Sequence, residues 1–317
     1  MKIGFIGLGN VGGKLAGSLL RNGFALTVHE LNKDLAKPLL DGGAQWADSP
    51  KATAEAVDMV ITCLPSPAAC AEVMEGENGV LAGLQKNAIW GEMSTTDESE
   101  VRRLGEKVIA QGGYAMDCPV SGGCHRAATG NIAIFVGGDR AAFERALPVF
   151  TAMGRRILHA GELGAASVLK VATNYLATAN LVSVCEALTT CKMAGMDLAT
   201  TYEAFRISSG NSFVHETEGQ VILNGSRDIN FTMDLVNKDI SLFQQIAERA
   251  GVPLELSPLL IKIFQDGEKR YGSREWSPNI IRRLEDACGV RITADGFPAE
   301  MVDDEPESPG AEVHPRS

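Results

Sequence analysis

Short apolar runs alternate with amphipathic stretches through the first half of the chain. The runs are as short as strands buried in a sheet, and the stretches between them have helical periodicity. Strands that alternate with helices predict parallel βαβ units, and therefore an α/β fold with a doubly wound sheet. The expected strands are Lys2–Ile6, Ala25–His29, Met59–Cys63, Ala88–Glu92, Tyr114–Cys118, Ile132–Val136 and Arg156–His159. The expected helices between them include Asn10–Asn22, Ala68–Glu75 and Glu98–Gln111.

The pattern changes after Gly161. From Gly164 to Met193 there is no Pro and no internal Gly, which predicts one long helix. We therefore expect a first domain over residues 1–161 and an all-helical second domain over residues 162–290. Residues 291–317 combine Pro, Gly and acids with few apolar positions, so we expect a mobile acidic tail. The further expected helices are Leu198–Ser208, Glu216–Leu223, Met233–Ala250 and Ser257–Tyr271.

Composition excludes some partners. The 317 residues carry a net charge of −11, and an acidic surface repels phosphate backbones, so nucleic acid is not an expected partner. The seven cysteines form no C-x-x-C pair and no zinc-like spacing with His, which predicts reduced thiols and no metal site. No signal peptide precedes the first strand, and no uninterrupted apolar stretch has the length of a membrane span. We expect a cytoplasmic protein with no membrane partner.

A glycine pattern comes directly after the first expected strand. It reads Gly7-Leu8-Gly9-Asn10-Val11-Gly12, and a helix is expected to follow. Gly7 permits a tight turn, Gly9 lets the backbone approach a pyrophosphate, and Gly12 lets helix and strand pack closely. The helix N-terminus then offers unpaired N–H groups to the phosphate charge. This context indicates a dinucleotide-binding loop rather than a glycine-rich turn alone.

Glu30 ends the second expected strand, about 20 residues beyond the glycines, where such loops have their ribose-binding acid. A carboxylate there accepts hydrogen bonds from the ribose hydroxyls of NAD and repels the extra phosphate of NADP. Leu31 and Asn32 supply no arginine, and Lys33 is the only nearby cation. The sequence therefore predicts NAD as the cofactor. The alternative is that Glu30 is a solvated acid at a strand end.

Four later segments carry polar residues at the expected carboxyl ends of strands or at the start of the long helix. In an open α/β sheet, ligands bind outside the carboxyl ends of the strands, so we expect the first three segments to line one crevice. Lys170 and Asn174 lie four residues apart on the long helix and share a face. The segments are Cys63-Leu64-Pro65, Glu92-Met93-Ser94-Thr95-Thr96, Asp117-Cys118-Pro119-Val120-Ser121-Gly122-Gly123, and Gly161-Glu162-Leu163-Gly164 followed by Lys170 and Asn174.

These segments resemble the β-hydroxyacid dehydrogenase family, which includes 3-hydroxyisobutyrate dehydrogenase, tartronate semialdehyde reductase and, more distantly, 6-phosphogluconate dehydrogenase. The resemblance runs in order from Lys2 to about Gly267 and includes Phe231…Leu235…Lys238-Asp239. It implies a Rossmann domain followed by an all-α C-terminal domain, as in 6-phosphogluconate dehydrogenase, and a homodimer or homotetramer. The resemblance also implies roles for single residues. Leu64, Pro65 and Thr95 would contact the cofactor, and Lys238 would reach its nicotinamide end. Ser121, Gly122 and Gly123 would hold the substrate carboxylate, Asn174 would orient the substrate, and Lys170 would be the catalytic base.

The residue types suit this chemistry. A serine followed by two glycines exposes backbone N–H groups to an anion. Lys170 can take the proton of the substrate hydroxyl if desolvation and a neighbouring Lys238 lower its pKa. In the reverse reaction its ammonium form stabilises the developing alkoxide. Two alternatives stay open: Lys170 as a solvated helical lysine, and Lys238 in a structural ion pair with Asp239 or Glu248.

Cys124-His125-Arg126 departs from the small residues that relatives have after Ser-Gly-Gly. His125 and Arg126 either face outward in a loop or narrow the substrate range. Arg126 could then reach a second polar or anionic group at the far end of the substrate. Cys118 and Cys124 have no identifiable base, so we interpret both as packing residues.

The predicted function is reversible NAD-dependent oxidation of the β-hydroxyl of a small hydroxy acid, similar to 3-hydroxyisobutyrate. Oxidative decarboxylation of a β-hydroxy acid is one alternative, but the expected phosphate-binding cations are missing. Imine reduction on the same scaffold is a second, and Lys170 argues against it. A third is a catalytically inactive module that only binds NAD.

Overall fold

The computed structural model describes residues 1–316, and its contacts divide the chain into two compact units. The Rossmann unit contains residues 1–170 together with the segment from Asp303 onward, and the helical unit contains residues 171–302. The expected boundary after Gly161 differs from this division, which falls after Lys170, inside the long helix. The chain therefore passes from one unit to the other twice.

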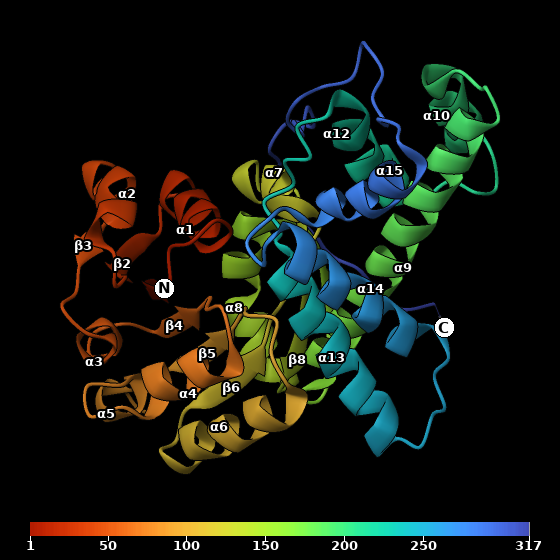
Figure 1. The fold of residues 1–317 in the computed structure, drawn as a ribbon. Coiled ribbons are helices and arrows are strands. Elements are labelled where there is room, and N and C mark those ends of the chain that lie inside the picture. The colour runs from red at the N-terminus through yellow and green to blue at the C-terminus, as the bar shows by residue number, and fades with distance from the viewer. Residues whose placement is uncertain (317) are drawn as a thin grey trace. The chain divides into compact units, whose positions relative to one another are not determined.

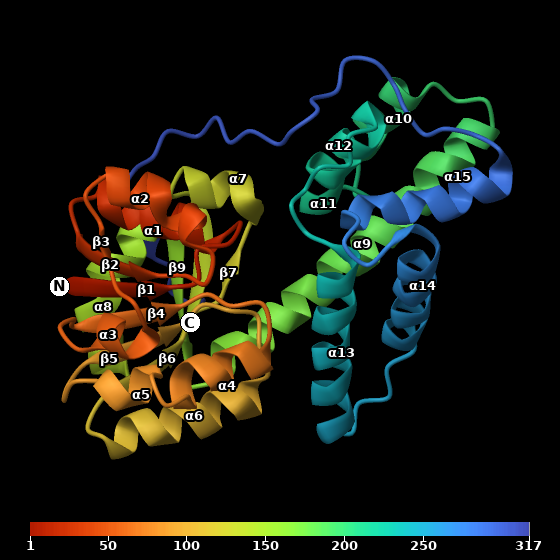
Figure 2. The same cartoon turned by 60° about the vertical axis from the view of Figure 1, so that its left-hand side comes forward.

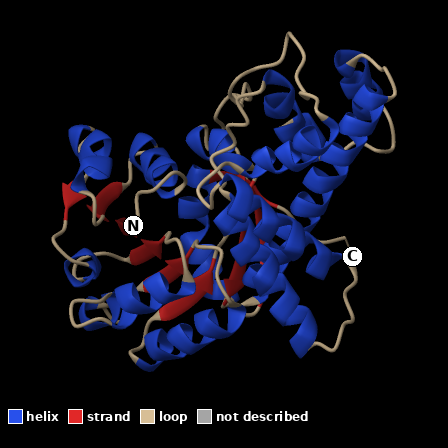
Figure 3. Cartoon of the chain, in the orientation of Figure 1, coloured by secondary structure: helices blue, strands red, loops and turns tan. Residues whose placement is uncertain are grey.

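The Rossmann unit is built on one sheet of ten strands (Figures 1 and 3), with the order β10-β9-β8-β6-β5-β4-β1-β2-β3 and β7 paired to β8. The run β3-β2-β1-β4-β5-β6 is all parallel and has the 3-2-1-4-5-6 order of dinucleotide-binding domains. The expected α/β fold is confirmed. The strands are β1 Lys2–Ile6, β2 Ala25–His29, β3 Gln45–Trp46, β4 Met59–Thr62, β5 Ile89–Glu92, β6 Tyr114–Asp117, β7 Val120–Ser121, β8 Ile132–Gly138, β9 Gly154–Gly161 and β10 Ala311–Glu312.

Side chains alternate between the two faces of the sheet and form a separate core on each. Ile3 and Phe5 of β1 join the core with α1 and α8, whereas Ile6 joins the opposite core. Contacts and Figure 2 agree that α1, α7 and α8 pack together, as do α3, α4, α5 and α6. The helices of this unit are α1 Gly12–Arg21, α2 Lys37–Asp41, α3 Pro50–Ala54, α4 Pro67–Glu75, α5 Val80–Gly83, α6 Glu98–Ala110, α7 Gly123–Ala128 and α8 Arg140–Met153. A 3₁₀ turn, Lys33–Ala36, precedes α2.

Two features of the sheet differ from the expectation. β8 runs antiparallel to β6, so β8, β9 and β10 form an oppositely directed edge of the sheet. The acidic tail predicted to be mobile instead returns to the Rossmann unit, where Ala311 and Glu312 pair with β9. The correction has a physical reason: backbone and carboxylate hydrogen bonds can dock a segment that has few apolar side chains.

The helical unit contains no regular strand among its described residues, as expected. Its core joins α9 to α10, α12, α13 and α14 through Leu188, Tyr202, Ile222, Ile240 and Phe264. The helices are α9 Ala165–Met193, which begins in the Rossmann unit, α10 Leu198–Arg206, α11 Phe213–Glu216, α12 Glu218–Asn224, α13 Met233–Arg249, α14 Leu256–Tyr271 and α15 Arg282–Cys288, with a 3₁₀ turn at Ser277–Ile281.

By length and composition, α9 could cross a membrane, which the sequence analysis did not expect. This is weak evidence, because long core helices pass the same test. Val171, Leu181 and Leu188 of α9 are buried within the protein.

Candidate active site

The glycine loop lies where the strand order reverses, between β1 and β4. A Cβ on Gly7 would lie 2.3 Å from the carbonyl oxygen of Cys63, and a Cβ on Gly12 would lie 2.1 Å from that of Gly7. A Cβ on Gly9 would meet nothing within 4 Å. The outer glycines therefore allow close backbone packing, while the middle one faces open space. The N-cap of α1 is Val11, whose side chain cannot accept a hydrogen bond from the first N–H groups of the helix. These N–H groups are therefore left for an anion, so this loop fits a pyrophosphate.

Glu30 follows β2 and points its carboxylate at this loop. One oxygen accepts the N–H of Leu8 at 2.7 Å, and the other accepts the N–H of Asn32 at 3.2 Å. The carboxylate is thus fixed where a ribose-binding acid is expected. The nearby cation, Lys33, lies over the ring of Trp46, with its Nζ 4.8 Å from the ring centroid.

Glu92 organises the next two cofactor segments from a buried position at the end of β5. Its carboxylate accepts the N–H of Ser94 at 2.7 Å and the hydroxyl of Thr62 at 2.9 Å. The hydroxyl of Ser94 in turn accepts the N–H of Leu64 at 2.7 Å. Burial raises the pKa of Glu92, while its hydrogen bonds act in the opposite direction. The loop with Leu64 and Pro65 and the loop with Thr95 are therefore held to one another.

Asp117, at the end of β6, holds the start of α9. Its carboxylate accepts the N–H of Gly164 at 2.8 Å and that of Ser167 at 2.6 Å, two groups that the first turn of a helix leaves without backbone partners. Burial raises the pKa of Asp117, and these backbone hydrogen bonds oppose the shift. Since Lys170 follows Ser167 by one helical turn, the sheet fixes the helix segment that carries the predicted base.

Lys170 is 9% exposed, which disagrees with a lysine that reaches freely into solvent. Asn174 lies four residues further along α9, on the same helix face. In the helical unit the amide of Asn174 donates to Asp239 at 2.5 Å, and the ammonium of Lys238 lies 3.0 Å from the other oxygen of that carboxylate. The ion pair of Lys238 and Asp239 is thus present, and it places Lys238 and Asn174 on one buried carboxylate.

The Ser-Gly-Gly segment leaves the sheet at β7 and enters α7. Ser121 pairs with Ala133 of β8, and Gly122 and Gly123 have φ values of +130° and +88°, which favour glycine. The ring of His125 lies close over Gly123, and the stem of Arg126 lies beside Gly122. Both side chains are half-buried, and both residues lie on helix α7 rather than in a loop.

The two cysteines that flank this segment behave as packing residues. Cys118 and Cys124 are both buried. Burial, followed by the charges of Asp117 and Glu92, raises the pKa of the Cys118 thiol well above its ordinary value. A thiol that stays protonated is a poor nucleophile.

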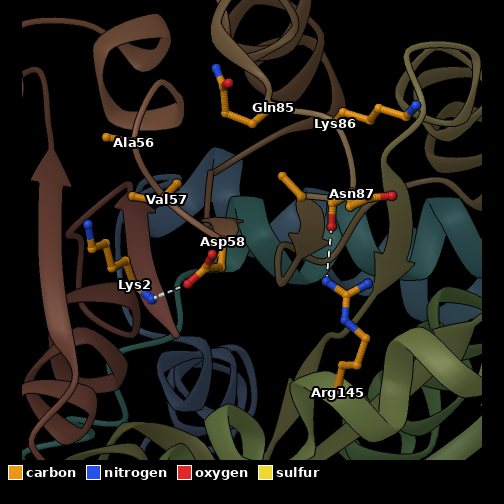
Figure 4. A pocket seen from close by; sticks show the side chains of 9 residues that line it. Lys2, Ala56, Val57, Asp58, Gln85, Lys86, Asn87 and Arg145 are labelled. Carbon is orange, nitrogen blue, oxygen red and sulfur yellow. Dashed lines mark hydrogen bonds between the residues drawn. The ribbon is translucent and has the colours of Figure 1, made fainter.

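A cavity in the Rossmann unit lies at the amino ends of the strands, away from the glycine loop (Figure 4). It measures about 340 Å³ and is lined by residues at the amino ends of β1, β4 and β5. In it, the backbone N–H of Lys2 donates to Asp58 at 2.7 Å and Arg145 donates to the carbonyl of Asn87 at 3.0 Å. None of the predicted site residues lines this cavity.

The sequence analysis gave no role to Glu92 and Asp117, whose carboxylates fix predicted site segments, and it named Asp239 only as an alternative ion-pair partner of Lys238. All three stand inside motifs that it quoted, and Asp239 is directly beside Lys238, to which it gave a role. An acid at the end of an apolar strand, such as Glu92 or Asp117, is the signal that could have found two of them, because a buried carboxylate needs donors.

A dinucleotide loop at the switch point of a 3-2-1-4-5-6 sheet, followed by a helix with a buried lysine, defines a class of nucleotide-dependent oxidoreductases. The family model described as the NAD binding domain of 6-phosphogluconate dehydrogenase matches residues 2–161. The model described as NAD-binding of NADP-dependent 3-hydroxyisobutyrate dehydrogenase matches residues 164–284. The chain belongs to the β-hydroxyacid dehydrogenase family, of the 3-hydroxyisobutyrate dehydrogenase type, and its cofactor is a nicotinamide dinucleotide.

Similar proteins agree with this membership. The chain is 31% identical over 294 residues to 2-(hydroxymethyl)glutarate dehydrogenase of Eubacterium barkeri, covering 92% of this chain and 98% of that protein. It is 32% identical over 293 residues to NAD-dependent L-serine dehydrogenase of Pseudomonas aeruginosa, covering 90% and 98%. A solved structure of 3-hydroxyisobutyrate dehydrogenase from Salmonella typhimurium matches with a TM-score of 0.82 at 26% identity, covering 89% and 99%. The resemblance stated from the motifs is confirmed.

Proposed function

We propose that the protein catalyses the reversible NAD-dependent oxidation of the β-hydroxyl of a small hydroxy acid to the semialdehyde or keto acid. The observation that carries the proposal is the buried position of Lys170, one turn after a helix start that Asp117 fixes to the sheet. A buried amine on a fixed helix segment is suited to proton transfer at a single substrate atom. The dehydrogenase names of the similar proteins support the same reaction type.

Each residue has one role in this proposal. The glycine loop and Glu30 hold the dinucleotide, with Leu64, Pro65 and Thr95 beside it and Lys238 toward the nicotinamide. When bound, the nicotinamide ring supplies the hydride acceptor. The backbone at Ser121, Gly122 and Gly123 binds the substrate carboxylate. The amine of Lys170 takes the proton of the hydroxyl, and in reverse its ammonium returns that proton. Asn174 donates to the substrate and adds no charge.

The carboxylate of Glu30 supports NAD over NADP in this proposal. It would face a 2′-phosphate with like charge, and the exposed Leu31 supplies no cation to offset that repulsion.

The substrate class can be narrowed by Arg126. Its guanidinium stands three residues after the carboxylate-binding glycines, on α7. We propose that the substrate carries a second polar or anionic group that this guanidinium meets. The relative named for 2-(hydroxymethyl)glutarate supports the idea, because that compound has a second carboxylate.

We further propose a cytoplasmic protein that acts as a homodimer or homotetramer. The small residues Ala165, Ala166, Ala172, Ala177 and Ala179 would permit close packing along α9. Light scattering at micromolar concentration measures this state directly, and a monomer at all concentrations would contradict it.

The test of the proposed function is a panel of hydroxy acids assayed with NAD and with NADP. We expect turnover with at least one of 3-hydroxyisobutyrate, L-serine, 3-hydroxypropionate and 2-(hydroxymethyl)glutarate. NAD should be preferred by roughly tenfold or more in kcat/KM, equivalent to about 1.4 kcal/mol. The double variant Glu30→Ser with Leu31→Arg should shrink or reverse that ratio. Preference of the unaltered protein for NADP would contradict the role of Glu30. Release of carbon dioxide faster than the spontaneous loss from the β-oxo product would indicate a decarboxylase instead.

A further inference from the structure

The chain after the helical unit returns to the Rossmann unit as an extended strap, defined here as residues Asp303–Glu312 (dark blue in Figure 2). Its far end is fixed by backbone pairing to β9 and by the carboxylate of Glu312, which accepts two hydrogen bonds from Arg140 at 2.5 and 3.0 Å. Gly310, just before β10, packs against the start of β9 and must be glycine, because a Cβ there would lie 1.9 Å from the carbonyl oxygen of Gly154. The matched family models end at residue 284, so the strap lies outside them.

The near end of the strap is fixed to the residues that follow α7. The carboxylate of Asp303 accepts hydrogen bonds from the hydroxyl of Thr129 and from the amide of Asn131, the latter at 2.8 Å. The same amide also donates to the carbonyl of Glu305 at 2.8 Å. Asn131 is only 4% exposed, and its partner Asp303 is half-buried, so these polar contacts are partly shielded from water.

The middle of the strap connects α7 to α1. The carboxylate of Glu307 accepts hydrogen bonds from Arg21 at 3.3 Å and from Asn22 at 3.0 Å, both at the end of α1. Arg21 also donates to the carbonyl of Ala128, the last residue of α7, at 2.9 Å. Glu307 lies so close to Gly130 that a Cβ on this glycine would approach it to 3.0 Å. The end of α7 is therefore held from two sides.

This position matters because α7 begins at Gly123, within the turn that binds the substrate carboxylate in the proposed function. Helix α7 has six residues and is too short to be stable by itself. Its position depends on the packing of Cys124 and Ala127, which are buried, and on contacts at its ends, where the strap holds Thr129 and Asn131 just beyond its C-terminus. The negative charge of Asp303 also acts on Arg126 and on His125 of the same helix.

We propose that Asp303 is a positioning residue for substrate binding, which acts through Thr129 and Asn131 to hold α7 and the Ser121–Gly123 turn in place. The inference rests on the proposed function, because it gives that turn its role. Asp303 contacts neither the glycine loop nor α9 in any hydrogen bond described above. Loss of its carboxylate should therefore weaken hydroxy-acid binding and leave the cofactor and the proton transfer unaffected.

The kinetic test compares Asp303→Asn with Asp304→Asn in the full chain. Asp304 is exposed and adjacent, so its variant removes one negative charge but leaves the hydrogen bonds of Asp303 to Thr129 and Asn131 in place. With whichever acid of the panel turns over best, we expect Asp303→Asn to raise KM for the acid at least fivefold. KM for NAD and kcat should stay within twofold, and Asp304→Asn should match the unaltered protein. A fall in kcat with no change in KM for the acid, or equal effects of both variants, would overturn the proposal.

Hydrogen exchange gives a second measurement that needs no substrate. Backbone amides of residues 123–131 should exchange several-fold faster in Asp303→Asn than in Asp304→Asn, while those of α1 and of β1 keep their protection. Uniform exchange rates in the two variants would overturn the proposal. If no hydroxy acid turns over, the proposed function fails, and the exchange rates still decide whether Asp303 holds α7.

Discussion

The two units fix their functional groups in different ways. In the Rossmann unit, buried or half-buried carboxylates accept hydrogen bonds from the backbone of loops and helix starts, as Glu30 does from Leu8 and Asp117 from Gly164. In the helical unit, the carboxylate of Asp239 is instead met by side chains, the amide of Asn174 and the ammonium of Lys238. At these three positions the same chemical group therefore orders backbone in the Rossmann unit and side chains in the helical unit.

The difference follows from where backbone donors are left over. Turns at strand ends and the first turn of a helix have N–H groups without regular partners, and an acid nearby satisfies them. In the middle of α9 and α13 every N–H is used by the helix itself, so a buried acid finds only side chains. A loop-based site is thus fixed through its backbone, whereas a helix-based site depends on each side chain separately.

Lys170 gives the largest expected effect, because it is the one proposed reacting group. Lys170→Ala should lower kcat by roughly 10²- to 10⁴-fold, the usual contribution of a positioned acid–base group. Affinity for NAD, measured by fluorescence titration, should change little because the glycine loop is untouched. Lys170→Arg should not restore turnover, since a guanidinium does not lose its proton near neutral pH. Turnover near the original rate in the alanine variant would remove Lys170 from the mechanism.

Asp239 tests the side-chain half of the comparison. Asp239→Asn removes a buried charged acceptor from two donors, and we expect it to lower the free energy of unfolding by about 2 kcal/mol. Asp234 is the control on the same helix, because it pairs at 3.0 Å with Arg274, whose side chain is 73% exposed. Asp234→Asn should cost less than about 1 kcal/mol. Denaturant titration measures both free energies of unfolding. Equal losses in the two variants would show that the burial of Asp239 does not increase its contribution to stability.

Arg126 tests whether a side chain of the Rossmann unit also has a functional role, because its guanidinium, and not the backbone, would select the substrate. Arg126→Ala should raise KM for 2-(hydroxymethyl)glutarate roughly tenfold, equivalent to about 1.4 kcal/mol. KM for 3-hydroxyisobutyrate, which lacks a second carboxylate, should hardly change. Parallel shifts for the two acids, or no shift for either, would leave Arg126 without a role in selectivity.

Glu218 concerns the pH dependence of stability. Burial raises its pKa from 4.5 to about 7, only partly opposed by a hydrogen bond from Ser277. The folded protein therefore binds more protons than the unfolded chain between these values, so this group lowers stability as pH rises from 4.5 to 7. Glu218→Gln should remove that decline, so the variant should lose less stability than the unaltered protein between pH 5 and pH 8. Melting curves at pH 5 and pH 8 measure it, and a parallel pH dependence in the variant would contradict it.

The local pattern of apolar and polar residues was sufficient to predict the longer strands and helices. β1 and β2 begin and end where the apolar runs do, and α9 ends at Met193 as expected. The two-residue strands β3, β7 and β10 were not predictable, because two residues cannot display an alternation. The reversed direction of β8 was missed as well, since strand direction depends on the path of the connection and not on the strand's own residues.

The site shows the same limit. The glycine loop could be predicted because close backbone approach requires glycine at fixed local spacing. The function of Asp117 could not, because its partner Gly164 lies 47 residues away, and Glu92 similarly reaches Thr62 across 30 residues. The strap was misjudged for a related reason. Its composition predicts solvation, whereas its docking depends on Arg21, Asn131 and Arg140, which lie far away in the sequence.

The return of the chain at Asp303 also has a consequence for biosynthesis. The whole helical unit interrupts the Rossmann unit, and β9, already paired with β8, obtains its second neighbour only when Ala311 and Glu312 have been translated. Until then the nascent sheet presents an open edge, the kind of surface that pairs with other chains. Ribosomes stalled within the helical segment should therefore display an aggregation-prone intermediate, and a chaperone that covers strand edges would find its client at this stage of synthesis.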